Sequence, residues 1–213
     1  MRDDSSTGAS GGWETPVVDE LDLLEWKRRV FGLYAEVRAA GDPEAAWHAW
    51  REAKDELFRA HPQSPLPVEK RASFGGLPYF DYDPELRVLA NIEPAEEARI
   101  LIAGSGEEPT PFRRFARAVF GDHRLALYWL EAYGGGVFLP FRDETSGTET
   151  YGAGRYQLDT VKGADLGEEG GRLVLDFNFA YNPSCAYDPR WACPLAPLEN
   201  RLTIPIRAGE RVP

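Results

Sequence analysis

Long apolar runs are missing from this sequence of 213 residues. No stretch approaches the ~18 consecutive apolar residues that a membrane-spanning helix needs, so no transmembrane helix is expected. The first thirteen residues, MRDDSSTGASGGW, also lack the apolar core of a secretory signal. The sequence therefore predicts a cytoplasmic protein without a membrane partner.

Positive charge is also scarce. The chain has 24 Lys and Arg residues against 35 Asp and Glu residues, which gives a net charge of -11 and a pI near 4.8. Nucleic-acid binding requires a clustered basic face. The only short basic pieces are Lys27-Arg28-Arg29 and Arg113-Arg114. We therefore expect no nucleic-acid partner.

The sequence lacks the common motifs of nucleotide, metal and hydrolase sites. No Lys-Ser/Thr follows Gly104-Ser105-Gly106, and Gly152-Ala153-Gly154 has no third glycine of a dinucleotide fingerprint. Neither a paired-histidine zinc motif, an EF-hand loop nor a nucleophile elbow is present. Cysteine is limited to Cys185 and Cys193. In a cytoplasmic protein we expect free thiols or ligands from them rather than a disulfide.

The composition is otherwise that of a globular protein, with 43% hydrophobic and 12% aromatic residues. Residues 1–18 are polar and rich in Gly and Ser, which predicts a flexible tail. Residues 19–62 show apolar and aromatic positions at helical spacing, interrupted at Gly41. The motif Asp42-Pro43-Glu44 resembles a helix start. These features predict an antiparallel helical hairpin, which contains Trp26, Trp47 and Trp50.

Residues 63–213 change to a β pattern of short strands separated by Gly-rich turns. The absence of alternating strands and helices argues against a nucleotide-binding α/β fold. The sequence predicts a mainly β (α+β) protein, with an antiparallel β barrel or sandwich that forms one compact unit with the N-terminal helical hairpin. The expected strands are Arg87–Glu93, Arg99–Ala103, Phe115–Phe120, Leu125–Tyr133, Val137–Phe141, Arg155–Val161, Arg172–Phe177 and Leu202–Arg207.

Two polar segments are candidates for chemistry. Residues 143–155 place Glu149, Tyr151 and Arg155 close together between two expected strands, where they fill a structural turn or contact a ligand. Residues 176–200 form a long connection, and long connections in compact domains tend to be functional. The candidates in this second segment are Asp176, Asn178, Tyr181, Asn182, Cys185, Cys193 and Asn200.

The two cysteines allow three interpretations. In the first, both are buried and inert, or form an occasional disulfide. In the second, they are half of a zinc site that His48, His61 or His123 completes. In the third, Cys185 is a nucleophile. The spacing between them is wider than that of common zinc motifs. No histidine lies near them in the sequence, although the fold could bring His61 close.

Three long motifs resemble those of domain-of-unknown-function family 1684, a set of uncharacterised prokaryotic proteins. These motifs are DETSGTETYGAGRY, LDFNFAYNPSCAYDPRWACPLAPLENRL and IRAGE. The likeness runs from about Phe74 to Glu210 and includes YFDYDPELRV. The resemblance implies no activity and assigns no role to any residue.

Two functional hypotheses follow from the residues. In the first, the protein is an enzyme or sensor that binds a small polar or anionic molecule in a pocket formed by residues 143–155 and 176–200. Arg155 would hold an anion, Asp176 or Glu149 would act as acid or base, and Cys185 would be the nucleophile or a metal ligand. Tyr151, Asn178, Tyr181, Asn182 and Asn200 would contact the ligand. In the second, the chain is a non-catalytic binding or scaffolding module that uses the Trp-rich hairpin, and its polar loops are structural.

Overall fold

The computed structural model describes residues 17–106 and 108–213. Most of the tail expected over residues 1–18 lies outside these ranges. The N-terminal part is a helical hairpin of α1 (Val17–Ala39) and α2 (Pro43–Ala60), followed by the short α3 (Val68–Arg71). The Asp42 carboxylate accepts hydrogen bonds from the amides of Glu44 and Ala45, each at 3.1 Å. It caps α2 as the sequence predicts, and the expected hairpin is confirmed. Within the described ranges, no helix combines the length and apolar character needed to cross a bilayer.

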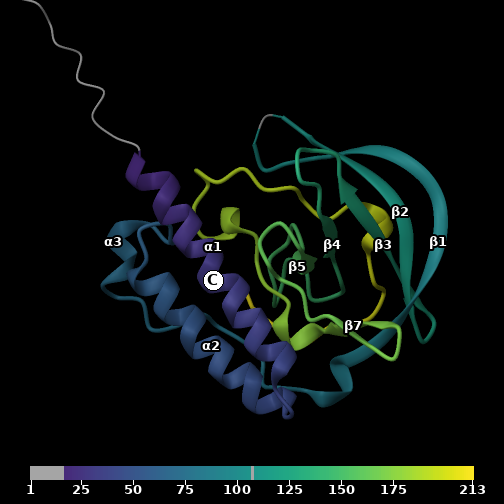
Figure 1. The fold of residues 1–213 in the computed structure, drawn as a ribbon, viewed down its shortest axis with the longest axis horizontal. Helices are drawn as coiled ribbons and strands as arrows, with labels where there is room; N and C mark the ends of the chain where they lie inside the picture. Colours follow the sequence, from purple (N-terminus) through teal and green to yellow (C-terminus); the bar gives the residue numbers. More distant parts are fainter. Residues whose placement is uncertain (1–16, 107) are drawn as a thin grey trace, which may run out of the picture.

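The strands that follow form one antiparallel sheet that curls into a half-barrel. The hairpin lies on the side of the molecule opposite the long strands β1 and β2 (Figure 1). The seven strands pair in the order β5-β4-β3-β2-β1-β7-β6. The mainly β, α+β fold class is therefore confirmed. The strands are β1 (Arg87–Ile102), β2 (Thr110–Phe120), β3 (His123–Leu130), β4 (Val137–Phe141), β5 (Arg155–Asp159), β6 (Glu168–Glu169) and β7 (Arg172–Asp176).

Irregular pairing accompanies the curl of the sheet. The registers of β1 with β2, β2 with β3 and β4 with β5 each shift once along the strand, and such bulges bend a strand and increase its twist. The shift in β1 lies between Pro94 and Ala98, so the two short strands expected there are one long bent strand. The curl brings β5 near β7, where the Gln157 side-chain amide donates to the carbonyl of Asp176 at 3.0 Å.

The strand expected at Leu202–Arg207 does not exist, and that prediction was wrong. The residue before the segment, Arg201, forms an isolated parallel bridge with Arg142, and the segment itself is irregular chain. Pro205 has no amide to donate to a ladder, and the carbonyls of Ile206 and Ala208 accept from Arg155 instead. The segment still contributes Leu202 and Ile206 to the core.

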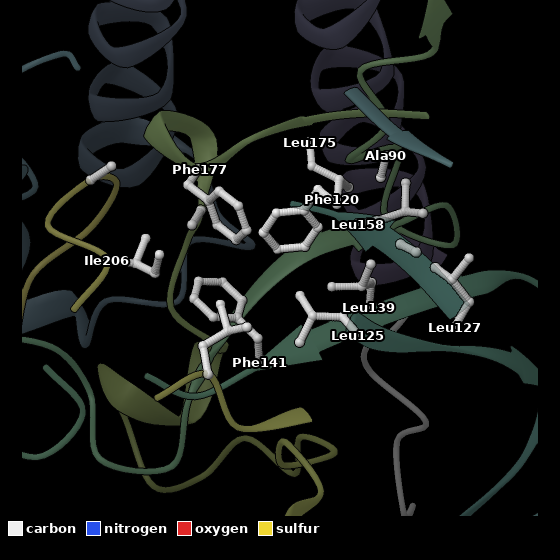
Figure 2. Close-up of a cluster of buried hydrophobic side chains, with 14 of the residues drawn as sticks. Ala90, Phe120, Leu125, Leu127, Leu139, Phe141, Leu158, Leu175, Phe177 and Ile206 are labelled. Carbon is white, nitrogen blue, oxygen red and sulfur yellow. The ribbon is translucent and has the colours of Figure 1, made fainter. Parts of the chain in front are cut away.

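The main core fills the inside of the curled sheet. Figure 2 shows the rings of Phe120, Phe141 and Phe177 close together in this core, with Leu139 on one side and Ile206 on the other. Successive residues of a strand point to opposite faces, so β3 sends Leu125 and Leu127 into this core and Ala126 and Tyr128 into a second buried cluster. Both faces of β3 are therefore covered.

The hairpin is attached to the half-barrel by its aromatic face. Trp47 and Trp50 are almost fully buried and pack with Tyr34 and Phe179. The Trp47 indole N–H donates to the carbonyl of Asn178 at 2.8 Å. The described residues also form four short 3₁₀ helices, namely η1 (Pro84–Leu86), η2 (Phe177–Phe179), η3 (Ser184–Ala186) and η4 (Leu198–Asn200).

Candidate functional site

A cavity of about 370 Å³ lies between the helical hairpin and two loops of the β domain. We call it the hairpin cavity. The hairpin contributes side chains from α1 and α2, and Gln63 and Pro65 follow α2. The two loops contribute Val161, Lys162, Ala164, Tyr181, Asn182, Ser184, Trp191, Ala192 and Cys193. Its volume is within the range of small-molecule sites.

The hairpin side of the cavity is apolar because one stripe of each helix faces it. On α1 the lining residues Leu23, Trp26, Val30 and Leu33 recur at three- or four-residue intervals, which places them on one face of a helix. From α2 come Trp50, Leu57 and Phe58, and the loop opposite adds Trp191. The wall therefore suits an apolar or aromatic body.

Every charged side chain that lines the hairpin cavity is a lysine. Lys27, Lys54 and Lys162 are three of the four lysines in the chain. No carboxylate is part of the described lining, although the protein carries a net charge of -11. The cavity thus concentrates positive charge in an acidic protein.

Lys54 is the most enclosed of these lysines and already has an anionic partner. It forms an ion pair with the fully buried carboxylate of Glu210. Glu210 also accepts from the Tyr79 hydroxyl at 2.9 Å, from the Asn182 amide at 2.8 Å and from the Tyr187 hydroxyl. Burial lowers the pKa of Lys54, and the charge of Glu210 opposes that shift. Because Lys54 is already paired with Glu210, it does not offer a free charge to a ligand.

The other two lysines lie nearer to solvent. Lys27 is exposed, and no carboxylate of the described residues lies within salt-bridge distance of it. The Lys162 side chain is 44% exposed, with its ammonium 4.0 Å from the Asp159 carboxylate. The positive potential of the site therefore comes chiefly from these two residues.

The two cysteines lie at the loop side of the cavity. Cys193 is buried and lines it, whereas Cys185 on η3 is half-buried. The Tyr151 hydroxyl lies 3.7 Å from the Cys185 sulfur. The Ser105 hydroxyl accepts from the Cys193 amide at 2.9 Å and donates to the carbonyl of Trp191 at 2.9 Å. This arrangement holds both thiols in place.

The surroundings of the two thiols lower the pKa of Cys185 and raise that of Cys193. Hydrogen bonding from Cys193, with help from Ser105 and Tyr151, lowers the pKa of Cys185 to about 5 against the opposing effect of burial. The pKa of Cys193 is raised, first because its thiol proton is shared with Cys185 and second because it is buried.

The zinc site considered from the sequence is not assembled in the described part of the chain. Residues 17–106 and 108–213 contain no group of three or more His, Cys, Asp and Glu side chains arranged to hold a metal ion. His61 is bound to Glu25, and its ring packs on Trp26. The rings of His48 and His123 pack on Trp47 and Phe120.

Arg155 lies away from the cavity, in the interior. It is 1% exposed, and its guanidinium donates to the Asp143 carboxylate at 2.6 Å and to the carbonyl of Ile206 at 2.9 Å. Further bonds go to the carbonyls of Ala208 and Glu210. Its hydrogen bonds therefore go to the protein's own chain, and they hold the C-terminal segment against β5.

Asp176, Asn178 and Asn200 are also buried away from the cavity. Asp176 caps η2 by accepting from the Asn178 amide at 3.0 Å, and burial raises its pKa. Asn178 donates to the carbonyl of Asp83 at 2.8 Å. Asn200 accepts from the Ala126 amide at 2.7 Å and donates to the carbonyl of Pro140 at 2.8 Å. These three side chains connect neighbouring backbone segments.

The remaining candidates divide between the surface and the cavity. Glu149 pairs with Arg207 on the surface through two oxygens, at 3.0 and 2.9 Å. Tyr181, Asn182 and Cys193 line the cavity, whereas Tyr151 and Cys185 are not part of its described lining. The Tyr151 hydroxyl lies 3.7 Å from the Cys185 sulfur, so these two candidates contact each other. No residue from 143–155 is part of the described lining.

The cavity also contains residues that sequence reasoning missed. Lys54, Lys162 and Trp191 line it, and Glu210 holds its floor. One signal was available, because Lys54 follows Trp50 by four residues and so interrupts the apolar face of a helix. Glu210, in the IRAGE motif, lies far from Lys54 in the sequence and gave no comparable signal.

Comparisons with known proteins point to a family of unknown function. The family model "Protein of unknown function (DUF1684)" matches residues 72–211. A solution NMR structure of an uncharacterized protein from Haloarcula marismortui is similar, with 35% sequence identity and a TM-score of 0.54. That likeness covers 79% of this chain and 93% of the other. No curated protein matches the chain. The motifs, the family match and the shared fold agree, and the chain belongs to the DUF1684 family.

Proposed function

We propose that the protein binds a small amphipathic anion in the hairpin cavity. The observation that carries this proposal is the charge of the lining, where Lys27 and Lys162 are cationic, Lys54 is paired with Glu210, and no carboxylate is part of the described lining. The ligand would have an apolar body and one anionic group such as a carboxylate. The sequence led us to expect a small polar or anionic ligand between residues 143–155 and 176–200; the proposed site keeps part of the second segment and replaces the first with the face of the hairpin.

The apolar body would lie among Trp26, Trp50 and Trp191. Burial of apolar surface contributes about 25 cal/mol per Å², so most of the affinity would come from this contact. Aromatic walls also favour flat ligands, because offset or edge-on ring contacts add to the burial.

The anionic group would lie near Lys27 and Lys162. Lys27 is exposed and the Lys162 side chain is 44% exposed, so each contributes only about 0.5 kcal/mol after solvent screening. The charge therefore selects anions over neutral molecules without dominating the affinity, and this selectivity should weaken as salt is added.

The catalytic interpretation stays a prediction. Asp176 and Glu149 lie outside the cavity, so they have no part in this binding proposal. Cys185 remains a candidate nucleophile beside the cavity. The scaffolding hypothesis has less support, because Trp47 and Trp50 face inward against the β domain.

Two fluorescent probes test the proposal, namely the anion 8-anilinonaphthalene-1-sulfonate and the neutral N-phenyl-1-naphthylamine. In the variant with Lys27→Gln and Lys162→Gln, the dissociation constant of the anion should rise about fivefold. The constant of the neutral probe should not change. Both probes should bind less well to Val30→Trp, which fills the cavity.

Lys70 provides the matched control because it is the one lysine outside the lining and is exposed on α3. Lys70→Gln should leave both dissociation constants unchanged. A fall in anion affinity with Lys70→Gln as large as that of the double variant would show a general charge effect. Equal losses for the two probes in the double variant would also contradict the proposal.

A further inference from the structure

The helix α1 carries two rows of apolar side chains. One row lines the hairpin cavity. The second row consists of Leu21, Leu24 and Phe31, each of which precedes a residue of the first row by two positions. Successive residues of a helix are about 100° apart around its axis, so the two rows lie roughly on opposite sides of α1. A surface helix ordinarily has one apolar face and one polar face, and the second row departs from that pattern.

The second row, which we call the outer row, is exposed to solvent. Leu21, Leu24 and Phe31 are 59%, 41% and 47% exposed, and α1 lies on the outside of the molecule (Figure 1). Together with the exposed Arg28 and Ala35, these residues recur at alternating intervals of three and four. This is the spacing of the contact between two helices packed side by side. A continuous exposed apolar row of this kind marks an interaction surface.

Charge is divided between the two halves of α1. Residues 17–25 contain four acidic side chains and no basic one, whereas residues 26–39 contain four basic side chains and one acidic one. Two copies of this helix lying antiparallel would set the acidic half of each against the basic half of the other. Two parallel copies would instead place like charges together, which opposes association. The charge pattern therefore favours a second, antiparallel copy of the same helix.

We propose that two copies of the chain associate through their α1 helices, which pair antiparallel along the outer row. A two-fold axis makes such a contact self-complementary. With the axis beside Trp26, Leu21 of one copy lies opposite Phe31 of the other, and Leu24 lies opposite Arg28. The aliphatic part of an arginine side chain can cover an apolar neighbour while its charged end stays in water. One register therefore covers all three large apolar side chains of the outer row.

The same register provides an ion pair between the two copies. Glu20 lies one helical turn before Leu24, so it comes near Arg28 of the second copy. Both side chains are exposed, and among the described residues neither forms an ion pair within its own chain. The two-fold axis generates this pair twice. Exposed pairs add little affinity, but they set the orientation of the helices.

Sedimentation equilibrium of the full chain, without added ligand, tests the proposal. At about 100 μM the parent should have a mass near twice 23.8 kDa, and it should dissociate on dilution. Leu24→Glu should be monomeric at the same concentration, because it places a charge in the apolar contact. Leu101→Glu is the matched control, since Leu101 is 70% exposed on β1, away from α1. This control should remain dimeric.

A charge exchange tests the antiparallel orientation. Glu20→Arg and Arg28→Glu should each raise the dissociation constant of the dimer about tenfold, and the double variant should return it to within about threefold of the parent. The circular dichroism of each variant at 222 nm should equal that of the parent, which shows that α1 is intact. A monomeric parent would overturn the proposal, as would a Leu24→Glu variant that stays dimeric. Failure of the double variant to recover would overturn the antiparallel pairing. None of these measurements depends on anion binding in the hairpin cavity.

Discussion

Two fully buried charged residues, Arg155 and Glu210, hold the C-terminal segment in place. Arg155 binds Asp143 and the carbonyls of residues 206, 208 and 210. Glu210 binds Lys54 from the hairpin and Asn182 from the long loop. Buried charges are tolerated only when paired and hydrogen-bonded. Both residues act as cross-links in place of the strand that the segment does not form.

Arg155→Met is expected to lower the free energy of unfolding by about 3–5 kcal/mol, because it leaves Asp143 as an unpaired buried charge. Urea denaturation would measure the change. Arg207→Met is the matched control, since Arg207 also binds a carboxylate but on the surface, and its effect should be within experimental error. A small loss for Arg155→Met together with weaker anion binding would instead return Arg155 to the ligand-binding role expected from the sequence.

At the scale of elements, the irregular C-terminal segment packs directly on η2. The backbone of Gly209 has a φ of +75°, and a Cβ built there would lie 2.5 Å from the carbonyl oxygen of Ala180 and 2.7 Å from that of Phe177. Only glycine allows this approach. This close packing brings the next residue, Glu210, against η2, where its backbone amide donates to the carbonyl of Ala180 at 2.9 Å.

Gly209→Ala is expected to destabilise the protein by about 3 kcal/mol, from the positive φ together with the clash against η2. Gly170→Ala is the control, because Gly170 has a φ of +57° with no atom within 4 Å of the added Cβ. Its cost should be about 1 kcal/mol. Thermal unfolding of the two variants would separate the backbone strain from the clash. Equal losses would show that the contact with η2 contributes nothing.

At the scale of the molecule, the hairpin and the half-barrel share their packing. Tyr34, Trp47 and Trp50 of the hairpin form one cluster with Ala164 and Phe179 of the β domain. Lys54 adds an ion pair to Glu210 near the end of the chain. The hairpin cavity is lined by both parts, so a ligand there would bind across their junction.

We expect the hairpin and the β domain to unfold together as a single unit. The helical signal at 222 nm, which comes mainly from α1 and α2, should be lost at the same temperature as the near-ultraviolet signal of the aromatic clusters. Both probes should give the same midpoint and the same van't Hoff enthalpy. Two separated transitions would show that the hairpin and the β domain fold independently, contrary to the expectation of one compact unit.

Local patterns in the sequence determined the elements and the family. The cap at Asp42, the apolar spacing along the hairpin and the Gly-rich turns act over a few residues, so they can be read without the fold. The same patterns indicated the long loop with Tyr181, Asn182 and both cysteines. They wrongly predicted a strand at Leu202–Arg207, because an apolar segment that is buried by tertiary contacts has the same composition as a strand.

Only the tertiary structure decided which polar residues share a site. Arg155, Asp176 and Tyr181 all carry polar groups that could contact a ligand, but the fold uses the first two in internal hydrogen bonds and places the third in the lining of the cavity. The lysines of the cavity lie on a helix of the hairpin or in a loop more than 100 residues away. Their joint charge is a property of the folded surface. Contacts between residues distant in sequence depend on how whole elements pack, and no local pattern carries that information.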